Sequence, residues 1–501
     1  MGSRQRRVRD SARGPYRIAP PRARSVTGAT RRGVLGDDFL FGVATAGFQI
    51  EGGFNGPGEP RNNWYRFESE GRVVPSGIAL DFWNDYETQL DHAVAAGANA
   101  FRFSLEWARC EPADGRIDDT AFARYADIIG ACAERGIEPL VTLHHFTHPD
   151  WAGEDFWLDD RAPERFAEWT ATAAAHLAPL ARYWVTINEW NIFALQTYVT
   201  GDFPPARTGD VRAAVRAFDH LLAGHVLAYE AIHAVRPDAV VATNGFAFST
   251  YGLERLGTDV LTARLAGVER ADLRTWLASR RSRYETALGA GGVASRAVNR
   301  LVDLDRALPR TVAAVHASAH ECTLDHIQTD YYNPSTMSHF RIPGHRTAGG
   351  RHWGPDRMLW DDPVDPERFG EHLAALQVTD RELWVVENGL CNRRRNGHAY
   401  ERVDGWDRPR YLQAHLRTLV AAHDAGVPMR AYFHWCLADN YEWGSYEPCF
   451  GLYGVDRERG VRWLSTDSMG RDSATTYRRL IEGLTAGDRS VLTCPVEDLA
   501  R

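Results

Sequence analysis

Two glutamates end apolar, strand-like runs of the sequence, and their residue type makes them the first candidates for catalysis. Glu189 and Glu387 each have an asparagine beside them, Asn188 and Asn388. Two carboxyl groups that face each other can cleave a glycosidic bond with retention: one attacks the anomeric carbon, and the other protonates the leaving oxygen and later activates water. For either glutamate alone, a helix cap or an arginine partner is the structural alternative.

The elements that must position these glutamates alternate along the chain from Leu35 onward. Eight β-rich runs alternate with segments of helical period, and this alternation predicts a closed parallel α/β fold, a (β/α)8 TIM barrel in a single domain with rim insertions. The expected strands are Phe39–Gln49, Ala100–Trp107, Pro139–His144, Tyr183–Glu189, Val240–Phe246, His326–Tyr332, Leu383–Glu387 and Met429–Trp435. The expected helices are Phe82–Ala95, Thr120–Arg135, Glu164–Leu180, Val211–Val235, Pro366–Leu376, Arg410–Ala425 and Ser473–Gly483. In such a barrel the carboxyl ends of the strands share one mouth, so Glu189 and Glu387 should meet there.

The remaining segments set the expected domain organisation. We expect a disordered, Arg-rich tail over 1–32, a catalytic barrel domain over 33–490 and a C-terminal tail over 491–501. Tyr251–Glu321 should add helices to the rim, and 335–362 should form a long loop beside the pocket.

Composition and charge exclude several classes of protein. The 501 residues are 44% hydrophobic and 25% charged, which is typical of a soluble globular protein. No apolar run reaches the roughly 20 residues of a membrane helix, and we expect no membrane partner. Residues 1–32 hold ten Arg and one Asp, which leaves a net charge of −17 on 33–501. This acidic body argues against a nucleic-acid partner, although a basic arm that docks on a partner stays open.

Cysteine usage and the N-terminal sequence indicate a reducing compartment. The seven cysteines are widely spaced and lack a CxxC pair, which favours buried, reduced thiols over disulfides or a zinc ribbon. The arginine pairs near the N-terminus are not followed by the apolar segment of an export signal. We therefore expect a cytoplasmic protein.

The two glutamate motifs resemble the signatures of glycoside hydrolase family 1, the β-glucosidase family, and the resemblance extends over roughly residues 37–485. Thr186-Ile187-Asn188-Glu189-Trp190 is similar to T-[FI]-N-E-P, and Val385-Val386-Glu387-Asn388-Gly389 to [IV]-[TV]-E-N-G. The resemblance implies that Glu189 is the general acid/base and Glu387 the nucleophile. It also implies that Asn188 hydrogen-bonds the 2-hydroxyl of the sugar.

The same resemblance implies roles for residues on the other strands. Arg102 should support the nucleophile by keeping its carboxylate ionised, and Tyr332 should donate a hydrogen bond to it. The remaining implied sugar-binding residues are Gln49, His145, Trp435, Glu442 and Trp443. Glu442 is also the acid that family members acting on 6-phosphoglycosides generally lack, because it would repel a phosphate, so we expect an unphosphorylated substrate.

Several positions depart from the family pattern. Trp190 replaces the Pro after the acid/base, Phe146 replaces Trp, and Asp330 replaces the Asn of N-Y-Y. Gln328 replaces a small residue on the same strand, and Cys449 stands where Arg is common. Trp190 and Asp330 are expected to alter the aglycone side or the electrostatics near Glu189.

The sequence predicts a retaining β-glycosidase of the β-glucosidase type, which takes a small-molecule β-D-glucoside or a close epimer and uses no cofactor. His144, His145 and His148 are clustered, and His316 and His320 stand four apart in an expected helix, but no HExxH accompanies them and we expect no metal. Two alternatives stay open: a transglycosylase with an apolar acceptor on the same machinery, and a carbohydrate-binding protein without catalysis. Glucose, galactose and fucose are not distinguished, and neither is the oligomeric state.

Overall fold

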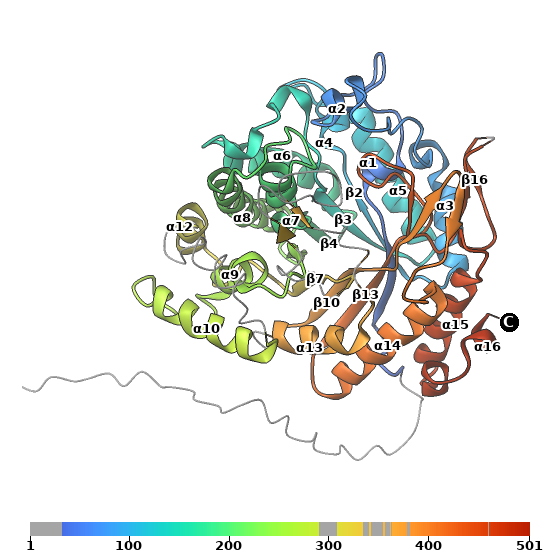
Figure 1. Ribbon diagram of the computed structural model, residues 1–501. Coiled ribbons are helices and arrows are strands. Elements are labelled where there is room, and N and C mark those ends of the chain that lie inside the picture. The colour runs from blue at the N-terminus through green and yellow to red at the C-terminus, as the bar shows by residue number, and fades with distance from the viewer. Residues whose placement is uncertain are drawn as a thin grey trace, which may run out of the picture.

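The computed structural model describes residues 33–289, 308–333, 340–341, 354–355, 361, 363–377, 381–458 and 460–500. A ring of parallel strands forms its centre (Figure 1). The ring strands are β1 (Leu40–Ala44), β2 (Ala100–Ser104), β3 (Glu138–His144), β4 (Tyr183–Ile187), β5 (Val240–Ala242), β6 (Asn244–Phe246), β7 (Ile327–Asp330), β10 (Leu383–Asn388) and β13 (Met429–Trp435). The predicted segment 1–32 lies outside the described residues.

The nine ring strands occupy the eight strand positions of the barrel, here called staves, because the strand at the fifth position is interrupted at one residue. Thr243 separates β5, which pairs with β4, from β6, which pairs with β7. The chain therefore closes the ring through this residue, and all the pairings within the ring are parallel. The predicted (β/α)8 barrel is confirmed.

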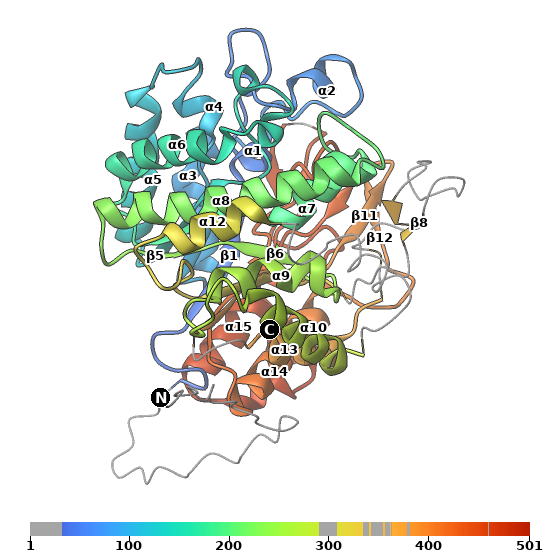
Figure 2. The same ribbon diagram turned by 90° about the vertical axis from the view of Figure 1, so that its left-hand side faces the viewer.

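Helices surround the ring on the outside (Figures 1 and 2). Asp210, Asp365 and Asp407 each precede a helix and accept a hydrogen bond from an amide of its first turn, which is the usual N-cap contact. The main outer helices are α3 (Phe82–Ala95), α5 (Asp119–Glu134), α6 (Ala162–Leu177), α8 (Val211–Val235), α13 (Pro366–Leu376), α14 (Arg408–Asp424) and α15 (Ser473–Thr485). Each predicted helix is present, with ends that differ by at most three residues.

Shorter elements complete the loops at the mouth and the rim. They are α1 (Gly47–Ile50), α2 (Tyr65–Ser69), α4 (Trp107–Cys110), η1 (Asp150–Ala152), η2 (Phe156–Leu158), α7 (Trp190–Leu195), η3 (Gln196–Thr200), β8 (Phe340–Arg341), β9 (Gly354–Pro355), β11 (Asn392–Arg395), β12 (His398–Tyr400), β14 (Pro448–Cys449), β15 (Val455–Asp456) and β16 (Arg462–Trp463). The expected extra helices after the fifth stave are α9 (Tyr251–Thr262), α10 (Leu273–Ala287) and α12 (Pro309–Ala317), while 290–307 lies outside the described residues. Most of the expected loop 335–362 is also outside them.

The inside of the barrel is filled by side chains rather than open. Its core includes Val185, Trp384 and Phe433, all of which are buried. A Cβ on Gly42 would lie 2.3 Å from the Phe433 ring, so only glycine fits on β1 at this level. Because the centre is packed, a ligand can reach the barrel only at the mouth.

Four predicted strands are too long at their carboxyl ends: those predicted to end at Glu189 and Tyr332 by two residues each, and the first two by more. The segment predicted as Phe39–Gln49 leaves the ring after Ala44 and forms α1, and the segment predicted as Ala100–Trp107 leaves it after Ser104. The physical reason is that backbone amides there donate hydrogen bonds to side chains instead of to a neighbouring strand. The amide of Gly47 donates to Ser104 Oγ over 2.6 Å, so it is not available to a strand ladder.

The ends of the chain and one helix also refine the sequence analysis. The segment 491–500 continues the packed structure through η6 (Arg489–Leu492) and α16 (Val496–Leu499), and Leu492 and Leu499 are buried. The expectation that His316 and His320 share a helix is wrong, because α12 ends at Ala317. No helix in the described part of the chain is long and apolar enough to cross a membrane.

Candidate active site

A cavity of about 320 Å³ opens at the mouth of the barrel, where the strands end. Of the residues that the sequence analysis selected, seven line it: Glu189, Glu387, His145, Tyr332, Trp435, Glu442 and Trp443. The other three, Arg102, Asn188 and Gln49, are fully buried behind this wall. The fold therefore brings all ten predicted residues to one site, although they are contributed by segments from residue 49 to residue 443.

Glu387 is held by two donors. Arg102 Nη1 donates to its Oε1 over 2.8 Å, and the Tyr332 hydroxyl donates to its Oε2 over 2.7 Å. Burial raises the pKa of Glu387 above its usual value, and the Arg102 charge and these two hydrogen bonds offset part of this rise. Each carboxylate oxygen thus has a partner that favours the ionised form.

Glu189 has the opposite environment. It is 6% exposed and lies at the start of α7 with a left-handed backbone (φ +40°), and its side chain does not cap that helix. Its Oε1 has no hydrogen-bond partner among the described residues. The pKa of Glu189 is raised well above its usual range. Burial is the largest cause, and the negative charges of Asp330 and Glu387 add to it. The site therefore favours a proton on Glu189 and a negative charge on Glu387.

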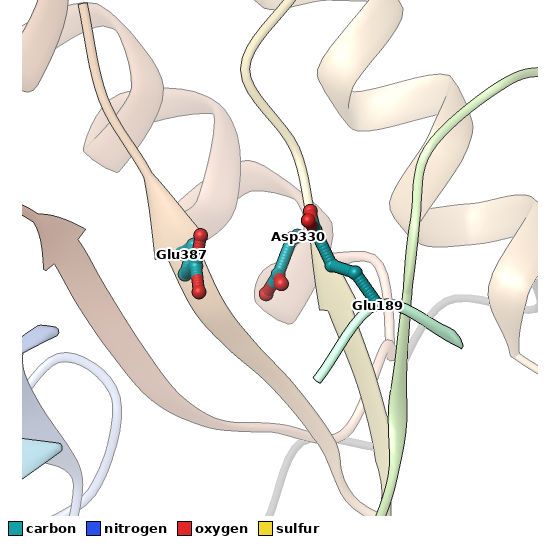
Figure 3. Close-up of side chains that lie close together, drawn as sticks. All are labelled: Glu189, Asp330 and Glu387. Carbon is teal, nitrogen blue, oxygen red and sulfur yellow. The ribbon is translucent and has the colours of Figure 1, made fainter. Parts of the chain in front are cut away.

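Asp330 is a third carboxyl group at the site, and sequence reasoning noted its substitution without placing it among the site residues. Figure 3 shows Glu189, Asp330 and Glu387 arriving from three different strand ends, with Asp330 between the two glutamates in that view. One oxygen from each carboxyl lies within 4.8 Å of the others. Asp330 is fully buried, its Oδ2 accepts a hydrogen bond from Asn244, and its Oδ1 lies 4.0 Å from Arg102 Nη1.

Asn244 was missed by the sequence analysis and links Asp330 to Asn188. Its side-chain amide donates to Asp330 and also to Asn188 Oδ1, the second contact over 3.0 Å. Asn188 Oδ1 accepts in addition from Arg102 Nη2 over 2.5 Å, and its amide lies 3.1 Å from His145 Nε2. A polar residue directly after the break at Thr243 was the available signal, because strand ends at this mouth carry the functional groups.

One group of lining residues combines flat rings with one acid. His145 stacks on Trp435 and Trp443, with ring centroids 5.8 and 5.7 Å apart. Trp435 Nε1 donates to Glu442 Oε1 over 3.0 Å, and burial raises the pKa of Glu442 to about 8. Gln49 Oε1 and His145 Nδ1 are buried and have no partner among the described residues. Such rings and unsatisfied polar atoms suit a sugar, which presents both apolar faces and hydroxyls.

Apolar side chains also line the cavity, among them Phe146, Ile192, Phe203 and Phe246, whereas Trp190 does not line it. The buried Trp190 ring packs edge-on against Phe218, at a centroid distance of 4.4 Å. A Cβ on Gly257 or on Gly245 would lie 3.0 or 3.1 Å from the Trp190 ring, so the two glycines make room for the residue that replaces the family's Pro.

The same site contains the carboxyl cluster whose spacing could suit a metal ion. Among the described residues, the three carboxyls are the one group of His, Cys, Asp or Glu side chains whose spacing could hold an ion. The Arg102 guanidinium already contacts Glu387 and lies near Asp330, and it supplies a positive charge at this point. His144 accepts a hydrogen bond from Trp157 over 3.1 Å and is packed in the core, as the sequence analysis expected.

Comparison with known proteins identifies the family. Residues 31–484 match the profile of Glycosyl hydrolase family 1. The chain is 25% identical over 483 residues to a 6-phospho-β-galactosidase of Clostridium acetobutylicum, covering 89% of this chain and 98% of that protein. It is 28% identical over 479 residues to a bifunctional β-D-glucosidase/β-D-fucosidase of Bifidobacterium breve, covering 88% and 97%.

Solved structures show the same fold. A family 1 β-glucosidase of Thermotoga maritima superposes with a TM-score of 0.67 at 22% identity, covering 92% of this chain and 100% of that one. The chain belongs to glycosyl hydrolase family 1 and is a retaining glycosidase that hydrolyses O-glycosyl bonds.

Proposed function

We propose that this enzyme hydrolyses an unphosphorylated β-D-glucoside or a close epimer, with Glu387 as the nucleophile and Glu189 as the general acid/base. The observation that carries these roles is the spacing of the two carboxyls, whose nearest oxygens lie within 4.8 Å. Retaining glycosidases hold their carboxyls about 5 to 5.5 Å apart, whereas inverting ones need roughly 6.5 to 9.5 Å to fit a water.

The contacts of the two glutamates divide the roles between them. Glu387, with Arg102 and Tyr332 as donors, attacks the anomeric carbon as a carboxylate. Glu189 gives its proton to the leaving oxygen, and after the glycosyl-enzyme ester has formed it takes a proton from the attacking water. Asn188 and His145 lie side by side and are proposed to bind sugar hydroxyls.

An unphosphorylated sugar is proposed although several relatives are named 6-phospho-β-galactosidases. The wall that carries Trp435 and Trp443 ends in Glu442, which supplies no positive charge for a phosphate dianion and repels it when ionised. Among the described lining residues Arg393 is the one cation, and Asp361 holds it with contacts of 3.1 and 2.5 Å. A carboxyl group at this wall can instead accept hydrogen bonds from two neighbouring sugar hydroxyls.

Trapping the glycosyl-enzyme tests the proposal. The protein is incubated with activated 2-deoxy-2-fluoro β-glycosides of the gluco and galacto series and of their 6-phospho forms. The expected result is a stable mass increase on the peptide that contains Glu387, with an unphosphorylated sugar only. An adduct with the 6-phospho sugars alone would overturn the substrate proposal, and an adduct on another residue would overturn the assignment of the nucleophile. Glu387→Gln is the matched control and should give no adduct.

Transglycosylation is the second candidate, because the cavity offers an apolar surface to an acceptor. Phe146, Phe203 and Phe246 are among the residues that line it. Product analysis in the presence of aliphatic and aromatic alcohols tests it. Release of free sugar alone at every alcohol concentration would exclude this candidate, whereas a dominant alkyl or aryl glycoside product would support it.

The state of the thiols supports a proposal for the cellular setting. All seven cysteines are free in the structure, and six of them are buried. Reduced cysteines are typical of the cytoplasm, and we propose cytoplasmic residence for the enzyme.

A further inference from the structure

Asp330 takes its position from the strand register. In the pairing of β7 with β10, Asp330 stands opposite Glu387, and in the pairing of β6 with β7 it stands opposite Phe246. It is 0% exposed and does not line the cavity. Its recorded contacts are with Asn244 and Arg102, both of which belong to the protein, so we expect its effect on the reaction to pass through a neighbouring side chain.

That neighbour is Glu189, because one oxygen of its carboxyl lies within 4.8 Å of an Asp330 oxygen and the Asp330 charge helps to raise the pKa of Glu189. Glu189 Oε1 and Asp330 Oδ1 are both buried without another hydrogen-bond partner among the described residues. Two carboxylates at this distance repel each other, and a shared proton removes the repulsion. The pair should therefore hold one proton over the working pH range.

The other contacts decide which carboxyl carries this proton. Asp330 has a donor at Oδ2, from Asn244, and the Arg102 guanidinium at 4.0 Å. Glu189 has no donor among the described residues that would favour its ionised form. The charge is therefore more stable on Asp330 and the proton on Glu189.

We propose that Asp330 is a positioning residue that holds the catalytic proton on Glu189, by accepting a hydrogen bond from the protonated carboxyl and opposing its ionisation. The inference rests on the proposed role of Glu189 as acid/base. The family pattern has asparagine at this position, and asparagine carries no charge. The proposed effect on Glu189 therefore depends on the aspartate that this chain has instead.

The charged and titratable groups around the pair come from several elements. Arg102 on β2 is the cation, Glu387 on β10 adds a negative charge, and Tyr332, which follows β7, donates to Glu387. His145 and Glu442 lie further along the cavity wall, and burial lowers the pKa of His145 well below its usual range. The single positive charge of Arg102 cannot balance three ionised carboxyls, so one of the three is expected to keep its proton.

The proton balance of the reaction is unchanged by Asp330. In the first step the proton of Glu189 moves to the glycosidic oxygen. At the same time the bond between this oxygen and the anomeric carbon breaks, and the ester between Glu387 and the anomeric carbon forms. In the second step water attacks the anomeric carbon, its proton moves to Glu189, and the ester bond breaks. Asp330 itself neither gains nor loses a proton. Before the first step it accepts a hydrogen bond from protonated Glu189 and delays loss of that proton at high pH, and in the second step its negative charge makes ionised Glu189 a stronger base.

The pH dependence of kcat/KM in Asp330→Asn tests the proposal. With an alkyl or phenyl glycoside, whose leaving group needs a proton, the alkaline limb should move to lower pH by at least about one unit, because a neighbouring negative charge is gone. With a dinitrophenyl glycoside, which needs no acid, the limb should not move. Glu442 also has a pKa raised to about 8, so Glu442→Gln is measured in parallel. If Glu442→Gln abolishes the alkaline limb and Asp330→Asn leaves it in place, the proposal is wrong.

A second measurement uses the trapped glycosyl-enzyme, in which the charge of Glu387 is absent. Its reactivation by water requires ionised Glu189, so the acid limb of reactivation against pH reports Glu189 directly. This limb should lie at higher pH in the wild-type enzyme than in Asp330→Asn, and azide, which needs no base, should remove it from both. If Asp330→Asn does not fold, a wild-type limb at the pH of an ordinary glutamate still overturns the proposal.

Failure of the proposed function would look different. Glu189→Gln should lose activity on the alkyl glycoside and recover turnover of the dinitrophenyl glycoside with azide. If it does not, Glu189 is not the acid/base and the assignment fails before Asp330 is considered. If it does, and the limbs of Asp330→Asn match those of the wild type, the assignment stands and only the role of Asp330 is refuted.

Discussion

Arg102 Nη1 lies 2.8 Å from Glu387 Oε1, and Nη2 of the same guanidinium lies 2.5 Å from Asn188 Oδ1. One side chain on β2 therefore joins the two glutamate motifs, which are carried by β10 and by the end of β4. Because the guanidinium is fully buried, its charge acts on these partners with little screening by solvent.

Replacement of this cation should weaken the nucleophile. We expect Arg102→Gln to lower kcat/KM by about 100-fold to 1,000-fold, since one fixed charged donor to the reacting group is lost. The Arg102 charge lowers the pKa of Glu387, so without it the acid limb of the pH profile should move to higher pH. Arg102→Lys keeps the charge and should recover part of the loss. An acid limb at the wild-type pH in Arg102→Gln would contradict the prediction.

Tyr332→Phe removes the second donor to Glu387. A hydrogen bond to a charged group contributes roughly 1.5 to 3 kcal/mol, so kcat/KM should fall about tenfold to 100-fold. The acid limb should again rise, because the Tyr332 hydrogen bond lowers the pKa of Glu387. Tyr331→Phe is the matched control: among the described residues its hydroxyl has one recorded hydrogen bond, a 3.5 Å contact with the Asp365 carbonyl, and steady-state kinetics should change less than about threefold.

Gly257→Ala should disturb the residue next to the acid/base. The added Cβ would lie 2.9 Å from Leu222 Cδ1 and 3.0 Å from the Trp190 ring, and we expect a loss of about 1 to 3 kcal/mol in the free energy of unfolding. Because Trp190 follows Glu189 directly, kcat should fall as well. Gly130→Ala, on the exposed face of α5 with nothing within 4 Å of the new Cβ, should be neutral or slightly stabilising in the same urea titrations. Equal effects of the two substitutions would refute this account.

Glu106 should make stability depend on pH. Burial and the nearby Glu51 raise its pKa to about 8 from a usual value of 4.5, so the native state binds its proton more tightly than the unfolded chain does. The stabilisation is complete below about pH 4.5, and it is lost as pH rises toward 8, at up to about 1.4 kcal/mol per unit.

Glu106→Gln keeps an acceptor for the Phe48 amide and removes this titration. The difference in free energy of unfolding between wild type and variant should therefore fall as urea denaturation is repeated from pH 5 to pH 8. Glu134→Gln, on the exposed surface of α5, should not show this trend. A wild-type advantage that stays constant with pH would speak against a protonated Glu106.

Much of this architecture was already determined by local sequence. The alternation of β-rich runs with amphipathic segments predicted the eight staves and the outer helices, because burial on one face imposes a fixed period on each element. The motifs around Glu189 and Glu387 predicted that the two carboxyls meet, since parallel strands end at a common mouth. The ends of the first two strands were predicted wrongly, because backbone donors such as the Gly47 amide bond to side chains of another strand.

The role of Asp330 was decided only by the tertiary structure. Its substitution was visible in the sequence, but its neighbours were not: the register opposite Glu387, the donor Asn244 on β6 and the 4.0 Å approach of Arg102 on β2 all depend on how separate strands pair. The same is true of Trp190, whose ring fits because Gly245 and Gly257 come close to it. Hydrophobic periodicity records which face of an element is buried, whereas the protonation of a buried carboxyl depends on the few charges within several ångströms, and these are brought together by strand pairing alone.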